Sequence, residues 1–254
     1  MPLLKEASEL LSKFFLNPEI PGISDLLNND FIIIVSRTMP LFALGKELIF
    51  PPVEMAEPDG LLAVGGDLSE DRILLAYRKG IFPWYEGNHI LWWSPDPRFV
   101  LFPDHLRITK SMKQLFKKNF FQFTFNKAFE RVIAECKSID RKGQDRTWIT
   151  PEMKDAYIRL HRQGYAQSAE AWKDGELVGG LYGIRLGKIF CGESMFSKVS
   201  NASKFAFISL VEHLKTEGIR IIDCQVYTAH LESLGAEMIP RQKFLQILEE
   251  SKHD

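Results

Sequence analysis

The order of strands and helices in the sequence predicts an α+β protein, with a small N-terminal α/β domain and a larger C-terminal domain on a mixed, mostly antiparallel sheet. Three observations predict it. Prolines, glycines and aromatic residues are dense between residues 50 and 103. Residues 168–195 contain three apolar strands separated by glycine-containing turns, which is typical of an antiparallel meander. Residues 190–226 follow the pattern strand, helix, strand, which predicts a βαβ unit with parallel strands.

Composition places the chain among ordinary globular proteins. Its 254 residues are 45% hydrophobic and 26% charged, with a formal net charge of −1. A nucleic-acid contact would therefore depend on a local basic patch. The three cysteines, Cys136, Cys191 and Cys224, show no metal-ligand spacing and suit a reducing compartment. We find no secretion signal, and apolar runs such as Phe31–Val35 are too short to span a bilayer, so we expect a cytoplasmic protein.

The N-terminal part contains one well-marked helix and an aromatic cluster. Leucine spacing predicts a helix at Leu3–Phe15, and Phe31–Val35 is strand-like. Ser69 is placed to cap a helix that ends before Gly80. Most tryptophans in such a cluster form a small core, but Trp84 follows a proline in a loop and is the better candidate for stacking on a base.

A proline-rich stretch predicts the domain boundary. The sequence SPDPR at residues 94–98 cannot form a regular element, because each proline restricts the residue before it. We expect domains at residues 1–98 and 99–254, although the stretch could equally be a rigid turn within one domain. Beyond it lies an amphipathic helix with a basic face, formed by Arg107, Lys110, Lys113 and Lys117. Such a face is usually only solvated, and phosphate contacts are the functional alternative.

The remaining elements follow from apolar spacing and helix-start signals. Thr150 and Pro151 mark a helix start, and Trp148 lies in the loop before it. Asn201 or Ser203 can cap the helix of the βαβ unit, which ends at Gly218. The other predicted elements are a strand at Phe120–Phe125, a helix at Ala128–Cys136, a helix at Pro151–Gln163, a turn or helix at Leu231–Gly235, a strand at Glu237–Pro240 and a helix at Arg241–Ser251.

Three polar residues interrupt the apolar βαβ unit. Glu193 lies in its first strand, and Asp223 and Gln225 lie two residues apart in its second, so we expect both of these side chains on one face. A buried carboxylate is costly unless it is paired or has a task. These groups could simply satisfy a neighbouring loop, or they could form a site.

The element order is that of the N-acyltransferase fold shared with acetyltransferases, in which two parallel strands separate in mid-sheet. Those strands would carry Glu193 and Asp223. An acyl-CoA enzyme needs a glycine-rich turn to bind pyrophosphate at the following helix, and residues 197–204 contain no glycine. This weakens the acyl-CoA interpretation and favours a donor with another polar handle.

Eight sequence blocks carry a family resemblance. In order, they are GLLAVGGDLS, YRKGIFPWY, LWWSPDPR, TWIT, ELVGGLYG, FCGESMFS, NASK and IIDCQV. In this order and spacing they resemble the leucyl/phenylalanyl-tRNA–protein transferase family, over roughly residues 50–248. The resemblance implies transfer of Leu or Phe, and Met as a further candidate, from aminoacyl-tRNA to the N-terminal Arg or Lys of proteins, which feeds the bacterial N-degron route.

The resemblance also implies roles for individual residues, with no cofactor and no metal, in a monomer that does not bind membranes. Asp223 and Gln225 would be catalytic, with the carboxylate polarising the carboxamide, and Glu193 would bind the acceptor. Trp84 and Trp148 would stack on the 3′-terminal adenosine. The implied aminoacyl pocket consists of Leu181, Leu210, Leu214 and Ile222, and the implied phosphate contacts are Arg107, Lys110, Lys113 and Lys117. Two other functions stay open: an acyl-CoA-dependent N-acyltransferase and a non-catalytic RNA-binding module.

Overall fold

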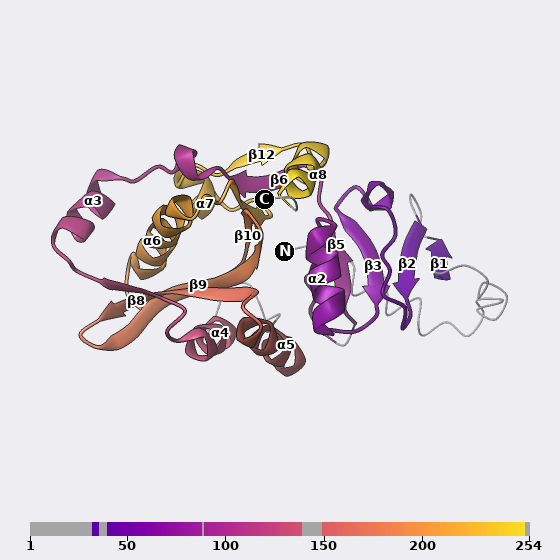
Figure 1. Cartoon of the computed structure of the whole chain (residues 1–254), viewed down its shortest axis with the longest axis horizontal. Coiled ribbons are helices and arrows are strands. Elements are labelled where there is room, and N and C mark those ends of the chain that lie inside the picture. Colours follow the sequence, from indigo (N-terminus) through magenta and orange to yellow (C-terminus); the bar gives the residue numbers. More distant parts are fainter. Residues whose placement is uncertain (1–31, 36–39, 88, 139–148, 252–254) are drawn as a thin grey trace. The chain divides into compact units, whose positions relative to one another are not determined.

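The computed structural model describes residues 32–35, 40–87, 89–138 and 149–251 (Figure 1). They form two compact units, divided between Asp96 and Pro97. The expected boundary at residue 98 stays a prediction. The expected helix at Leu3–Phe15 and the loop residue Trp148 lie outside the described residues.

The N-terminal unit contains a five-stranded sheet in the order β1-β2-β3-β5-β4, in which β2 and β3 are parallel and the other pairs are antiparallel. Ser69 caps α2, because its side chain accepts a hydrogen bond from the Arg72 N–H, as predicted. Trp92 and Trp93 are buried in strand β5 of the sheet, so the core interpretation holds for both. The elements are β1 (Ile32–Val35), β2 (Pro40–Leu44), a short 3₁₀ helix (Val53–Met55), β3 (Leu61–Gly65), α2 (Glu70–Arg78), β4 (Phe82–Pro83) and β5 (Leu91–Trp93).

The C-terminal unit is built on a seven-stranded sheet in the order β12-β6-β11-β10-β9-β8-β7. In this sheet β10 and β11 pair in parallel, as the βαβ pattern predicts. The elements are β6 (Arg98–Leu101), a short 3₁₀ helix (Pro103–His105), α3 (Lys110–Lys117), β7 (Gln122–Phe125), α4 (Phe129–Ser138), α5 (Pro151–Arg162), β8 (Ala166–Lys173), β9 (Glu176–Leu186), β10 (Ile189–Ser197), α6 (Ala202–Thr216), β11 (Ile221–Gln225), α7 (Ala229–Ser233), β12 (Glu237–Ile239) and α8 (Arg241–Glu250).

Helices cover both faces of this sheet. Figure 1 shows α6 on one side of β8 and β9, and α4 and α5 on the other, in agreement with their contacts. The main hydrophobic core lies under α6, where Phe205, Leu210 and Leu214 pack on side chains from the strands. The α+β class with mixed sheets is therefore confirmed.

Two local expectations need correction. The stretch SPDPR was expected to lie outside regular structure, but Arg98 is the first residue of β6, which pairs with both β11 and β12. Asn201 occupies the cap position of α6 with a left-handed φ of 70° and makes no side-chain cap. Instead, the Ser197 side-chain oxygen accepts a hydrogen bond from the Ser203 N–H at 3.3 Å. The hydroxyl of Ser197, at the end of the preceding strand, thus accepts a hydrogen bond of the kind expected from the side chain of the cap residue.

Candidate functional site

The candidate site lies where the two parallel strands separate. β10 and β11 pair only from Ile189 and Ile221 to Cys191 and Asp223, although both strands continue further. Backbone pairing thus ends where the polar residues begin. Side chains, rather than peptide groups, bridge the strands beyond this point.

Both strands carry a bulge at the point of separation. In β10 the register against β9 shifts between Gly192 and Ser194, so Glu193 is the extra residue. In β11 the register against β6 shifts between Asp223 and Gln225. Bulges re-aim side chains and are frequent beside active sites. Here the bulges change the face of the sheet on which the polar side chains that follow in each strand would otherwise lie.

Asp223 is held by a buried ion pair with Arg98. The Arg98 Nε lies 2.8 Å from Asp223 Oδ1, and Nη2 lies 2.7 Å from Oδ2, so the contact is bidentate. The exposed fractions of the two side chains are 1% and 0%. Asp223 Oδ1 also accepts a hydrogen bond from the backbone N–H of Gln225 at 2.9 Å.

Gln225 contacts Glu193 across the gap between the strands. Its side-chain Nε2 donates to Glu193 Oε1 at 2.7 Å, and the Tyr157 hydroxyl on α5 donates to Glu193 Oε2 at 3.0 Å. We expected the Asp223 carboxylate to polarise this carboxamide from the same strand face. Because the bulge breaks the alternation, Asp223 reaches the Gln225 backbone instead, and Glu193 is the carboxylate that holds its side chain.

Two cysteines flank Asp223, and both are poor nucleophiles. Burial, followed by the nearby Asp223 charge, raises the pKa of Cys191 well above its ordinary value. The same two causes raise the pKa of Cys224. Since the thiolate is the nucleophilic form, a covalent cysteine intermediate is disfavoured here.

Trp84 is described in the N-terminal unit, whereas its expected partner Trp148 lies outside the described residues. Trp84 follows β4 directly, and it is half-buried. Its backbone N–H donates to Leu91 O at 2.9 Å, and the ring lies 5.8 Å from that of Trp93 at a tilt of 58°. The residue is thus held by neighbours and keeps part of its surface exposed.

The four residues expected to form an aminoacyl pocket all belong to the core under α6. Leu181 and Ile222 come from the strands, Leu210 and Leu214 come from the helix, and all four side chains are buried. The structure brings them together in one apolar cluster. Their role as a pocket stays a prediction.

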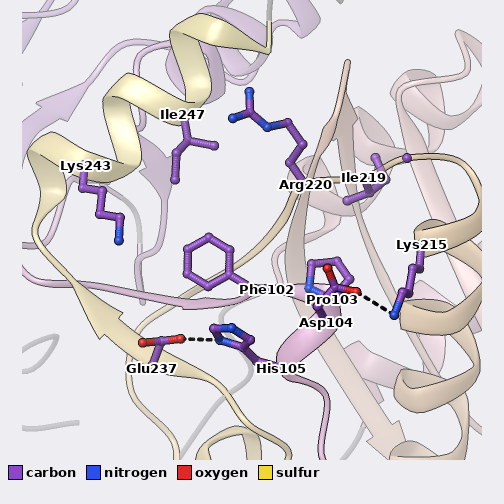
Figure 2. Close-up of a pocket in the computed structure, with 11 residues that line it drawn as sticks. Phe102, Pro103, Asp104, His105, Lys215, Ile219, Arg220, Glu237, Lys243 and Ile247 are labelled. Atoms are coloured by element: carbon purple, nitrogen blue, oxygen red, sulfur yellow. Dashed lines mark hydrogen bonds and ion pairs between the residues drawn. The ribbon is translucent and has the colours of Figure 1, made fainter.

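A cavity of about 720 Å³ lies elsewhere in the C-terminal unit, and none of the predicted site residues lines it. Lys215 pairs there with Asp104 at 2.6 Å, and the His105 ring contacts Glu237 at 2.8 Å, while Lys243 and Arg220 also line the cavity (Figure 2). Because none of the polar residues of the separated strands lines this cavity, we take those strands, and not the cavity, as the candidate site.

The expected basic face is exposed along α3. Lys110, Lys113 and Lys117 lie on α3, and Arg107 precedes it with its N–H bonded to Leu234 O. Among the described residues, no carboxylate forms an ion pair with any of the four. Met112 and Phe116 anchor the other side of the helix against the core. The face is therefore open to phosphates, and that role stays a prediction.

Two residues of the site were missed from the sequence. Arg98 was assigned to a boundary loop, although the apolar run Phe99–Phe102 behind it indicated a strand. Tyr157 was predicted only as part of the helix at Pro151–Gln163, and no local pattern marks its hydroxyl. Within the described ranges, no group of three or more His, Cys, Asp or Glu side chains is arranged to hold a metal ion, and no helix is long and apolar enough to cross a membrane.

Comparison with known proteins decides the family. Residues 100–249 match the family model of leucyl/phenylalanyl-tRNA protein transferase, and residues 66–96 match the model of its N-terminal domain. A leucyl/phenylalanyl-tRNA–protein transferase of Christiangramia forsetii is 61% identical over 82% of this chain and 100% of its own length. The chain belongs to this family. It is therefore an enzyme, a transferase.

Other members of the family are also similar. The relative from Flavobacterium johnsoniae is 57% identical over 82% of this chain and 99% of its own length. The relative from Pseudomonas fluorescens is 55% identical over 80% of this chain and 91% of its own length. Among solved structures, a GCN5-related N-acetyltransferase from Kribbella flavida matches at 10% identity, covering 66% of this chain and 59% of its own, with a TM-score of 0.34.

Proposed function

We propose that this enzyme transfers Leu or Phe, with Met as a further candidate, from aminoacyl-tRNA to the N-terminal Arg or Lys of acceptor proteins. The observation that supports it is the bridge between the separated strands, in which Gln225 and Glu193 meet at 2.7 Å. The proposal includes a cytoplasmic monomer that marks its products for degradation through the N-degron route.

The reaction is the attack of an amine on an ester. A bond forms between the acceptor nitrogen and the aminoacyl carbonyl carbon, the ester C–O bond breaks, and the amine proton ends on the departing 3′ oxygen of the tRNA. This exchange is downhill, so the chemistry requires no ATP. The enzyme's task is to hold ester and amine together and to manage one proton.

Gln225 and Glu193 suit the management of that proton. The Gln225 Nε2 donates to a carboxylate, and this polarises the carboxamide and makes its oxygen a better acceptor for an N–H of the incoming amine. Glu193 is half-buried, so its charge can favour a basic acceptor terminus. Tyr157 fixes the other carboxylate oxygen.

The tRNA would be held by stacking and by phosphate contacts. A half-exposed tryptophan such as Trp84 is a sequence-tolerant platform for the terminal adenosine, and Trp148 is its predicted partner. The basic face on α3 supplies cations for the phosphates. Leu181, Leu210, Leu214 and Ile222 are the proposed apolar surroundings of the Leu or Phe side chain.

The start of α6 argues against an acyl-CoA donor. A pyrophosphate there needs free N–H groups at the helix N-terminus. The N–H of Ala202 bonds to Val199 O, and the N–H of Ser203 bonds to Ser197 Oγ. These donors are thus occupied within the protein.

The decisive experiment offers the purified enzyme tRNA charged with labelled Leu, Phe or Met, and a peptide that begins with Arg. We expect label on the peptide without ATP or CoA, and none on the same peptide with an acetylated N-terminus. No transfer with any of the three amino acids would overturn the proposal. A thermal shift with acetyl-CoA would instead support the acyl-CoA alternative.

A further inference from the structure

The Arg98–Asp223 ion pair lies directly behind the bulge that carries Gln225. Both side chains are buried, and the contact uses two hydrogen bonds of 2.8 and 2.7 Å. Bidentate guanidinium–carboxylate pairs combine strength with a fixed geometry. The Arg98 guanidinium also lies 4.8 Å from the centre of the Phe244 ring on α8, which holds it from a second side.

The ion pair lies beside an unusual backbone conformation. Gln225 has a φ of 64°, in the left-handed region that non-glycine residues seldom adopt. Its N–H is bonded to Asp223 Oδ1, the same oxygen that accepts the Arg98 Nε. Asp223 therefore offers the acceptor that stabilises the turn, and Arg98 fixes the direction of that acceptor.

This left-handed turn aims the Gln225 carboxamide at Glu193. From this backbone conformation, the carboxamide nitrogen lies 2.7 Å from Glu193 Oε1. In a regular strand, the Gln225 side chain would instead lie on the same face as that of Asp223, two residues earlier. An unbroken chain of contacts thus runs from Phe244 through Arg98, Asp223 and Gln225 to Glu193.

We infer that Arg98 is a positioning residue for aminoacyl transfer. It acts through Asp223, whose task is to hold the left-handed turn at Gln225 rather than to exchange a proton with the acceptor. Both Asp223 oxygens are already occupied by Arg98 and by the Gln225 N–H, and the carboxylate has no exposed surface. Glu193, which is partly exposed, is the carboxylate that faces the acceptor. This inference rests on the proposed function.

The first test is Arg98→Met, which removes the charge and both hydrogen bonds at similar size. We expect kcat to fall roughly 100-fold, because a misplacement of about 1 Å in a reacting group has an effect of that size. We expect KM for Phe-tRNA to stay within about twofold of the wild-type value. Activity is corrected for the folded fraction by circular dichroism. A kcat that is unchanged per folded molecule, or a loss confined to KM, would overturn the inference.

The second test separates a hydrogen-bond acceptor from a charge at position 223. In the Arg98→Met background, Asp223→Asn keeps an oxygen for the Gln225 N–H and removes the uncompensated charge, whereas Asp223→Leu removes both. We expect the Asn double variant to be roughly tenfold faster than the Leu double variant and faster than Arg98→Met alone. Equal rates for the two double variants would overturn the inference, because the oxygen that accepts the Gln225 N–H would then not matter to the reaction.

Two further variants keep the test decisive if Arg98→Met folds poorly. Arg98→Lys retains the positive charge but has one donor nitrogen in place of the planar guanidinium. We expect a kcat between those of the wild type and Arg98→Met, with KM unchanged. Arg162→Met breaks an exposed pair with Glu130 and serves as the matched arginine control with wild-type kcat. A wild-type kcat for Arg98→Lys would contradict the need for bidentate geometry. If the wild-type enzyme fails to transfer at all, the proposed function fails first, and the two failures are thereby distinguished.

Discussion

A single backbone N–H, that of Gln225, joins the fully buried and the partly exposed parts of the site. On its inner side lie Asp223 and Arg98, and on its outer side the Gln225 carboxamide faces Glu193. The polar residue types in the βαβ unit were enough to predict Glu193, Asp223 and Gln225 as site candidates. Which of these side chains contact one another was not predictable, because it depends on two bulges that shift the side-chain alternation and have no signature in either strand.

Cys191 offers a test of how deeply this region is buried. Burial and the Asp223 charge raise the pKa of the Cys191 thiol in the folded enzyme, whereas the unfolded thiol titrates near its ordinary value of about 8.5. Between these two values the folded state binds more protons than the unfolded state. The free energy of unfolding therefore falls as pH rises above about 8.5, by up to about 1.4 kcal/mol per pH unit for this group.

Cys191→Ser isolates that contribution, since serine keeps a hydroxyl donor toward Asp223 and does not ionise in this range. We expect the difference in free energy of unfolding between wild type and variant to be constant from about pH 6 to 8. Above about pH 8.5, the wild type should lose stability relative to the variant as the pH rises. Urea unfolding at each pH measures it. Parallel stability curves up to about pH 10 would show that the thiol is not buried beside Asp223.

At the scale of elements, β9 and β10 approach each other closely next to Glu193. A Cβ on Gly183 would lie 2.2 Å from Cys191 O and 2.6 Å from the Phe190 ring. We expect Gly183→Ala to force the strands apart, at roughly 2 kcal/mol or more, because backbone cannot move aside cheaply. Thermal unfolding should show a Tm lower by about 4–8 °C, with reduced transfer activity per folded molecule.

Gly192 lies opposite Gly183 in the same register and is the matched control for stability. A Cβ there would meet only Asp223 O at 3.6 Å, an ordinary contact. Gly192→Ala should change stability by less than about 0.5 kcal/mol. An equal destabilisation by both alanines would mean that glycine is needed throughout this strand pair rather than at one close contact.

Local signals predicted some elements closely and others poorly, for identifiable reasons. α2 and α5 were predicted well, because Ser69 and Thr150 carry the capping chemistry within their own sequence. β6 was missed because prolines precede it, and its partners β11 and β12 lie far along the chain. The α6 cap was assigned to the wrong residue because a hydroxyl from β10 replaces it. Tertiary partners of this kind leave no trace in a local window.

At the scale of the whole molecule, the enzyme combines a net charge of −1 with a basic face that carries no ion pair within the described part of the chain. Bulk charge does not attract a polyanion, so any salt-dependent tRNA binding must come from local patches. The three lysines of α3 are exposed and ready to meet phosphates. Other exposed cations of the C-terminal unit, such as Arg162 and Arg220, are already paired with carboxylates.

Replacing Lys113 and Lys117 with glutamine tests whether α3 is that patch. We expect weaker binding of aminoacyl-tRNA, and a slope of log K against log salt that is shallower by about 0.7–0.9 for each phosphate that the variant no longer neutralises. Filter binding between about 50 and 300 mM salt measures the slope. Lys243→Gln, on α8 beside the cavity of Figure 2, is the control and should leave the slope unchanged.

The same pair of variants separates tRNA binding from chemistry. If the control lowers the slope as much as the α3 variant, the tRNA contacts are spread over the surface; if neither changes it, the basic face is only solvated. Under the proposed function, kcat at saturating tRNA reflects the Gln225–Glu193 bridge rather than phosphate contacts, so we expect the α3 variant to keep the wild-type kcat. A lower kcat there would show that phosphate binding and the transfer step are coupled.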